Sequence, residues 1–192
     1  IMRALPNMTV ISVSDADEMA VMMDQTLDWP GPIYIRLGKG GDPIVSDITE
    51  NFRIGKAICK REGADVALVT TGVLVKPCLD AAETLQAEGI SCAVVHLPTV
   101  KPIDTDGLVA ALPAGAPIIC VEEHLRTGGL GSTVLETLSD RHCGLVGSVV
   151  RHGLPDEFVH TYGSQNILWN KFGLDAEGIA ANVRATLQQA DN

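Results

Sequence analysis

The chain has 192 residues, 46% of them apolar, so it is long enough to enclose one sizeable hydrophobic core together with an appendage. Its formal net charge of −10, without any cluster of Lys and Arg, argues against nucleic acid and anionic membranes as partners, because both require a basic surface. No apolar run approaches the ~20 residues of a membrane span, so we expect no membrane segment.

The cysteines favour a reduced compartment, and we expect the protein to be cytoplasmic. They are odd in number, form no C-x-x-C pair, and several lie in apolar runs: Cys59, Cys78, Cys92, Cys120 and Cys143. The first residues lack the long apolar stretch of a secretory signal. A chain that begins one residue before a methionine is expected to be a piece of a longer protein.

The first 37 residues predict a strand at 9–13, a helix and a second strand at 33–37. The helix begins with one of two capping pairs, Ser14 with Asp17 or Asp15 with Glu18. Three- and four-residue spacing predicts one buried helix face, formed by Ala16, Met19, Ala20, Met23 and Leu27. Two strands and one helix cannot enclose a core alone. This piece is therefore expected to complete a sheet from residues outside the chain, or to pack against the remainder of this chain.

Glycines and a proline at residues 38–43 form the clearest linker, which predicts two domains, 1–46 and 47–192. From about residue 64, apolar strands at 66–69, 91–96, 118–121 and 145–150 alternate with helices. The helices are expected after Gly72, ending at Gly89, and at 104–112, 130–141, 165–172 and 176–188, with a loop at 97–102. This alternation predicts an α/β fold, a three-layer α/β/α sandwich with a mainly parallel sheet.

Glu122, Glu123 and His124 come directly after the strand at 118–121, where open parallel sheets usually bind their ligands. They form either an acid/base or metal set, or a structural capping and salt-bridge cluster at a domain or subunit contact. Neighbouring strand residues point to opposite faces, so all three converge only if the strand has ended. The structural interpretation is favoured, and without zinc-type Cys/His spacing we expect no metal site.

Three glycines lie just beyond this cluster, Gly128, Gly129 and Gly131, in a pattern that is not the dinucleotide G-x-G-x-x-G. They present helix N–H groups to an anion, or they allow a tight turn and close helix packing, which is the favoured interpretation. Arg36 and Lys39 lie at a strand end in a glycine-rich loop and are candidates for binding a phosphate or carboxylate, with a solvated loop charge as the alternative. His96 is expected to be a buried, hydrogen-bonded histidine.

Several stretches in order along the chain resemble one family. They are I-M-R-A-L-P-N-M at 1–8, S-D-A-D-E at 14–18, G-P-I-Y-I-R-L-G-K at 31–39, T-V-K-P-I-D at 99–104, E-E-H at 122–124 with G-G-L-G at 128–131, G-L-P-D-E-F at 153–158 and G-L-D-A-E-G-I at 173–179. Together they resemble thiamine-diphosphate-dependent transketolases, and most closely the separate C-terminal section of enzymes that are split into two subunits. Asp15 stands where the family has a proline.

The resemblance implies transfer of a two-carbon ketol unit between sugar phosphates, with thiamine diphosphate and a divalent metal (Mg) in the complete enzyme. It makes residues 1–46 the tail of the pyrimidine-binding domain and 47–192 the C-terminal domain. The expected partners are a second copy in a homodimer, an N-terminal transketolase half, or both. The family's activating glutamate and its G-D-G diphosphate motif have no counterpart here, so we expect no catalytic residue and no cofactor bound to this chain alone.

For the site residues, the resemblance aligns Lys39 with an arginine that contacts the substrate phosphate, with Arg36 as the neighbouring alternative. Lysine keeps the charge but lacks the bidentate fork, which bears on phosphate affinity and substrate choice. Glu122, Glu123, His124 and the three glycines become a signature of the C-terminal domain and a candidate subunit contact. The remaining alternatives are 1-deoxyxylulose-phosphate synthase, the beta subunit of a 2-oxo acid dehydrogenase, and a non-catalytic dimerisation module.

Overall fold

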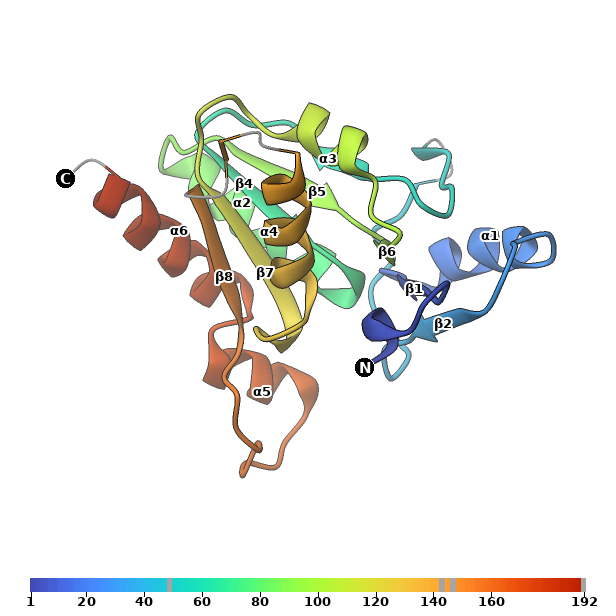
Figure 1. Cartoon of the computed structure of the whole chain (residues 1–192). Coiled ribbons are helices and arrows are strands. Elements are labelled where there is room, and N and C mark those ends of the chain that lie inside the picture. The colour runs from blue at the N-terminus through green and yellow to red at the C-terminus, as the bar shows by residue number, and fades with distance from the viewer. Residues whose placement is uncertain (48–49, 142–143, 146–147, 191–192) are drawn as a thin grey trace.

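The computed structural model describes residues 1–47, 50–141, 144–145 and 148–190. In this part of the chain the helices and strands form a large sandwich, with a smaller N-terminal piece beside it (Figure 1). The N-terminal piece consists of the 3-10 turn η1 (Met2–Ala4), β1 (Thr9–Ser12), α1 (Ala16–Thr26) and β2 (Ile33–Arg36). None of the described helices combines the length and the hydropathy needed to cross a membrane.

The sandwich is built on a five-stranded sheet in the order β3-β5-β4-β7-β8. Its strands are β3 (Ile58–Arg61), β4 (Val66–Thr70), β5 (Cys92–His96), β7 (Ile118–Leu125) and β8 (Val149–Leu154). All neighbouring strands are parallel except β3, which runs antiparallel to β5 at the edge. The predicted fold, a sandwich with a mainly parallel sheet, is confirmed.

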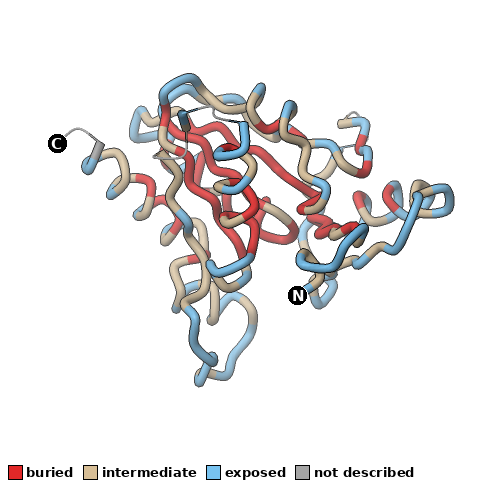
Figure 2. The backbone as a smooth tube through the Cα atoms, viewed as in Figure 1, coloured by how far each residue is buried: buried red, intermediate tan, exposed pale blue. Residues whose placement is uncertain are grey.

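Two helix layers cover the sheet. The helices are α2 (Val75–Ala87), preceded by the 3-10 turn η3 (Gly72–Leu74), α3 (Thr105–Ala111), α4 (Leu130–Asp140), α5 (Gln165–Phe172) and α6 (Ala176–Ala190). In β4, Val66 and Leu68 pack with α2 and α6, whereas Ala67 and Val69 pack with α3 and α4. This alternation follows from the pleat of the strand. The sheet is therefore buried on both faces (Figure 2), which explains its continuous apolar strands.

The N-terminal piece packs against the sandwich, as one of the two sequence-based alternatives expects. β1 pairs in parallel with β2 and antiparallel with β6 (Thr99–Lys101), giving a separate sheet in the order β2-β1-β6. Behind this sheet, apolar residues from both sides of the linker form one buried cluster: Ile11, Val13, Met22, Phe52, Ile54 and Ile58. The prediction of a simple loop at 97–102 is thus wrong, because its middle residues supply an edge strand to the N-terminal piece.

The predicted buried face of α1 is confirmed only at Met19, which packs against the buried cluster behind this helix, and is wrong for its other four residues. Ala16, Ala20, Met23 and Leu27 are exposed, and the residues that face inward are Glu18 and Met22. The reason is that α1 covers a polar contact with His96 as well as apolar residues, so its inner face is not its most apolar face. The outward apolar side chains form a surface that suits contact with further protein.

Other differences concern strand ends. β3 is a short edge strand that the sequence pattern does not reveal, and β7 continues through Leu125, beyond the predicted end at 121. The predicted strand at 145–150 includes residues 146–147, which lie outside the described residues, and the observed β8 begins only at Val149. The helices match their predicted ranges to within a few residues.

Candidate functional site

Glu122 lies buried beneath the start of α4. Its Oε2 accepts a hydrogen bond from the backbone N–H of Leu130 at 2.7 Å, and its Oε1 accepts one from Gly131 at 3.0 Å. These N–H groups open the helix and have no partner within it. Glu122 therefore supplies the negative charge that a helix N-terminus favours. Burial raises the pKa of Glu122, and the two N–H donors oppose that rise.

The glycines around α4 make room for this carboxylate. A Cβ on Gly129 would lie 1.7 Å from Oε2 of Glu122, and a Cβ on Gly153 of β8 would lie 2.9 Å from its Cγ. At Gly128 the backbone itself favours glycine, because its φ of +75° lies in the left-handed region that other residues rarely adopt. The N–H groups of Leu130 and Gly131 already donate to Glu122. The alternative from the sequence, that the N–H groups at this helix start bind an external anion, is therefore wrong for these two groups.

Glu123 points away from Glu122 and joins the N-terminal piece to α5. Its Oε1 accepts hydrogen bonds from Nε2 of Gln165 and Nε1 of Trp169, both at 2.8 Å. Nη2 of Arg36 donates to the backbone carbonyl of Glu123 at 2.8 Å and forms an ion pair with Oε2 at 3.3 Å. The guanidinium of Arg36, at the end of β2, is thus paired with the carboxylate of Glu123, near the end of β7.

His124 does not complete an acid/base set with the two glutamates. Its Nδ1 lies 2.8 Å from the carbonyl oxygen of Leu125 and 4.0 Å from Oε2 of Glu122, and its side chain is half exposed. The three residues lie on a continuing strand, with Glu122 and Glu123 directed to different partners. A convergent set therefore does not form, and a contact of this tip with another subunit stays a prediction.

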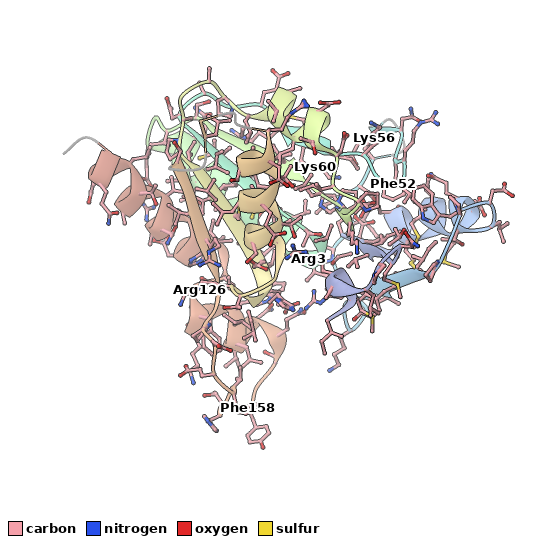
Figure 3. All side chains as sticks on the ribbon, viewed as in Figure 1. Arg3, Phe52, Lys56, Lys60, Arg126 and Phe158 are labelled. Atoms are coloured by element: carbon pink, nitrogen blue, oxygen red, sulfur yellow. The ribbon has the colours of Figure 1, made fainter. Side chains whose placement is uncertain are left out.

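A cavity of about 350 Å³ lies between the N-terminal piece and the tip of β7. Two arginines and a histidine contribute to its lining, Arg3, Arg36 and His124, together with Tyr34. Nη1 of Arg3 donates to the carbonyl oxygen of Gly128 at 2.8 Å, and its guanidinium also pairs with Glu136 of α4. Figure 3 shows Arg3 between the N-terminal piece and α4. The cavity walls therefore come from residues far apart in the sequence.

Lys39 lines a different cavity, of about 590 Å³, formed by the glycine-rich loop, the start of α2 and α5. The same cavity is lined by Ser164, Gln165 and Trp169. Lys39 itself is exposed. The structure thus separates the two candidate cations, Arg36 and Lys39, into neighbouring cavities whose linings both include residues hydrogen-bonded to Glu123.

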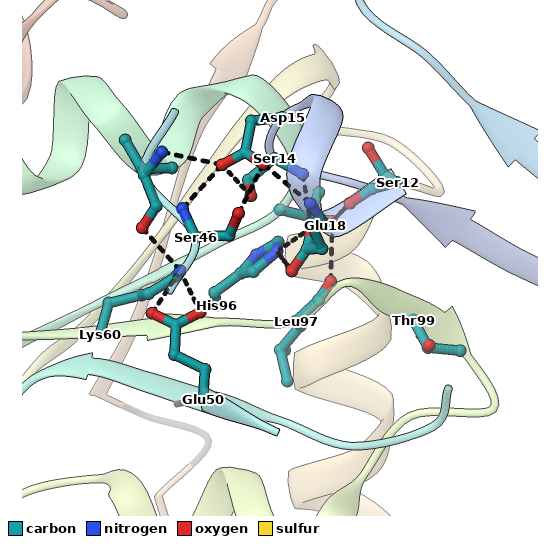
Figure 4. A network of polar contacts seen from close by, with 12 residues as sticks. Ser12, Ser14, Asp15, Glu18, Ser46, Glu50, Lys60, His96, Leu97 and Thr99 are labelled. Atoms are coloured by element: carbon teal, nitrogen blue, oxygen red, sulfur yellow. Dashed lines mark hydrogen bonds and ion pairs between the residues drawn. The ribbon is translucent and has the colours of Figure 1, made fainter. Parts of the chain in front are cut away.

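A third group of polar residues ties α1, the linker and the sandwich together (Figure 4). His96 Nε2 lies 3.1 Å from both carboxylate oxygens of Glu18, and both side chains are buried. Burial by itself would raise the pKa of Glu18. The charge and hydrogen bond of His96, together with the N–H of Ser14 and the charge of Lys60, outweigh burial, so the pKa of Glu18 is lowered. The expectation that His96 is buried and hydrogen-bonded is met at Nε2, whereas its Nδ1 has no partner among the described residues.

Asp15 is the centre of this group. It is the N-cap of α1, accepting from the N–H groups of Asp17 and Glu18, and it also accepts from the linker, from N of Val45 and from N and Oγ of Ser46. Burial opposes ionisation, but the hydrogen bonds outweigh it and lower the pKa of Asp15 to about 2. The proline that Asp15 replaces in the resembling motif could not make these contacts.

Sequence reasoning missed the linker contacts of Asp15 and the roles of Gln165 and Trp169. The capping pair of Asp15 with Glu18 is one of the two predicted alternatives, but a carboxylate that also holds residues 45–46 leaves no periodic signal. Gln165 and Trp169 stand one helical turn apart on α5, which is a usable sign of a shared partner. That the partner is Glu123 could not be read from the sequence, since 42 residues separate it from Gln165.

Residues 55–179 match the family described as "Transketolase, C-terminal domain". A 1-deoxy-D-xylulose-5-phosphate synthase of Syntrophotalea carbinolica is 40% identical over 185 residues, covering 95% of this chain and 29% of the relative. The putative uncharacterized transketolase family protein y4mN of Sinorhizobium fredii is 32% identical, covering 97% of this chain and 54% of the relative. The chain thus spans only part of the curated relatives that it matches.

Among solved structures, one described as "Split gene transketolase, inactive beta4 tetramer" superimposes with a TM-score of 0.87 at 36% identity. The match covers 97% of this chain and 60% of that chain. A transketolase of Pichia stipitis, at 22% identity and a TM-score of 0.71, shares the fold.

Proposed function

We propose that this chain, which belongs to the transketolase C-terminal-domain family, is the C-terminal portion of a thiamine-diphosphate-dependent enzyme that transfers a two-carbon ketol unit between sugar phosphates. The observation that supports the proposal best is the pair of cations, Arg36 and Lys39, at neighbouring cavities beside the N-terminal piece. Cationic side chains at such positions suit the phosphate of a sugar substrate.

In the proposed arrangement, residues 1–46 are the tail of a pyrimidine-binding domain and residues 47–192 form the C-terminal domain. The outer face of α1 and the end of β2 expose large apolar side chains, namely Val21, Met23, Leu27, Tyr34 and Leu37. An exposed apolar surface of this kind supports contact with further protein. We assign that contact to the upstream part of the enzyme, with a second copy completing a homodimer.

The described residues do not offer a site for the divalent metal of the cofactor. Among the described residues, no three His, Cys, Asp or Glu side chains are grouped so that they could hold a metal ion. We therefore place the cofactor on the upstream part and assign no reaction step to it. The share of this chain in the reaction is to bind and orient the substrate phosphate. The solved relative described as an inactive tetramer supports the view that such a chain does not catalyse alone.

Lys39→Ala in the complete enzyme is expected to raise KM for the phosphorylated sugar by roughly tenfold while kcat changes little, because uniform binding energy is lost. Lys39→Arg should give a KM equal to or lower than that of the unsubstituted enzyme, since the guanidinium of arginine can bind a phosphate through two donors. Lys56→Ala is the matched control, because Lys56 is exposed, pairs with Asp104 and lines neither of the two cavities. Steady-state kinetics of the three variants decides: an unchanged KM for Lys39→Ala removes Lys39 from the site.

A second candidate is 1-deoxy-D-xylulose-5-phosphate synthase, which the 40% identical relative favours. A 1-deoxy sugar ends in a methyl group where a transferred ketol unit carries a hydroxymethyl group. Analysis of the products of the complete enzyme therefore separates the two activities. A ketose with a terminal hydroxymethyl group supports transketolase, and a 1-deoxyketose phosphate supports the synthase.

A further inference from the structure

We propose that Glu123 is a positioning residue that holds the guanidinium of Arg36 toward the substrate phosphate and links it to the cavity of Lys39. The inference rests on the proposed function, since it gives Arg36 a phosphate to bind. It goes beyond that function by adding two residues of α5, Gln165 and Trp169, to the substrate-binding apparatus.

Arg36 is anchored through a single nitrogen. Its Nη2 makes both of the contacts to Glu123, one to the backbone carbonyl and one to the carboxylate. No other hydrogen bond of the guanidinium is found within the described residues, so Nη1 and Nε keep their three N–H donors. Arg36 also lines the 350 Å³ cavity. A guanidinium held through Nη2 keeps its remaining donors in fixed directions, so Nη1 and Nε can each donate a single hydrogen bond to a phosphate oxygen.

Glu123 itself lies in an irregular stretch of an otherwise regular strand, because the register between β7 and β8 shifts between Val121 and Leu125. Such irregularities redirect side chains and are common beside functional sites. Here the redirection brings one carboxylate between β2, where Arg36 lies, and α5.

The α5 side of the carboxylate reaches the second cavity. Oε1 accepts from Gln165 and Trp169, and these two side chains also line the cavity of Lys39. Oε2 accepts from Arg36, which lines the other cavity. One carboxylate therefore connects the walls of both cavities. Any change in the orientation of Arg36 on binding a phosphate is transmitted through Glu123 to the indole of Trp169.

In the complete enzyme, Glu123→Ala is expected to raise KM for the sugar phosphate by roughly tenfold with kcat little changed, and Glu123→Gln should raise it less. Glu83→Gln, on the exposed face of α2, is the control for loss of a carboxylate. The decisive comparison is the double variant with Arg36→Ala. If Glu123 acts through Arg36, Glu123→Ala adds almost nothing to KM once Arg36 is absent. An additive effect overturns the proposal.

A readout without turnover separates this proposal from the proposed function. Inorganic phosphate is titrated into the complete protein, and the emission of Trp169 is obtained by subtracting the spectrum of Trp169→Phe. A saturable shift that is lost in Arg36→Ala and in Glu123→Ala is expected. Absence of any shift overturns the coupling even in an active enzyme. A shift without any ketol transfer supports the coupling and counts against the proposed function alone.

Discussion

Glu122→Ala is expected to lower the free energy of unfolding by about 3 kcal/mol, because two buried N–H groups at the start of α4 lose their acceptor. Glu122→Gln should cost less, since one amide oxygen remains to accept, while the new NH₂ group faces a donor. Chemical denaturation of the purified protein measures both changes. A loss below about 1 kcal/mol for Glu122→Ala would contradict the capping role.

The capping role of Glu122 also predicts an unusual rescue at Gly129. In the natural sequence, Gly129→Ala places a Cβ 1.7 Å from Oε2 of Glu122, so the carboxylate must leave the helix end. We expect a loss of stability close to that of Glu122→Ala. In a Glu122→Ala background only the backbone carbonyl of Leu125, 2.9 Å away, still obstructs the Cβ, so Gly129→Ala should cost less stability there than in the natural sequence. Equal costs in both backgrounds would show that another contact, such as the carbonyl of Leu125 2.9 Å away, sets the requirement for glycine.

Asp15→Ala is the second substitution with a large expected effect, a loss of about 3 kcal/mol, because it removes the N-cap of α1 and the acceptor for residues 45–46 together. Asp17→Ala provides the matched control, since Asp17 is exposed in the first turn of the same helix and should cost little. Equilibrium unfolding of both variants makes the comparison. Similar losses of stability for Asp15→Ala and Asp17→Ala would mean that the contacts of Asp15 with the linker do not stabilise the fold.

The carboxyl group of Asp15 should also contribute to the dependence of the free energy of unfolding on pH in acid. The folded pKa of Asp15, about 2, lies below its ordinary value of 3.8. Between these values the unfolded chain binds more protons, so stability falls as the pH falls. The stabilisation from Asp15 is therefore complete above about pH 4 and is lost as the pH drops through about 2. The Asp15→Ala variant should show a shallower acid dependence in this window.

The sandwich could be predicted from the sequence because burial on both faces leaves a strong local signal. Continuous apolar strands such as residues 66–69, each preceding a helix with apolar spacing, allow few other arrangements. The short edge strands β3 and β6 give no such signal, because three or four residues with mixed burial resemble a loop. The buried face of α1 could not be predicted because the helix buries Glu18 against His96, which local hydrophobicity cannot reveal.

The candidate site could be predicted only in part. The sequence singles out Arg36, Lys39, Glu122, Glu123 and His124, and spacing suggests that the last three belong together. The structure directs Glu122 to α4 and Glu123 to Arg36 and α5. These destinations depend on which elements lie beside the tip of β7, and contacts across 87 residues, as between Arg36 and Glu123, leave no trace in local spacing. That these residues bind substrate remains a proposal.

The most direct measurement of the proposed function is a ketol-transfer assay of this chain, alone and after addition of the upstream portion with thiamine diphosphate and Mg²⁺. We expect no transfer by the chain alone and turnover once the upstream portion is present, with loss of phosphate affinity when Arg36 or Lys39 is replaced by alanine. Transfer by the chain alone, or turnover of the upstream portion that does not change when this chain is added, would contradict the proposed division of the enzyme.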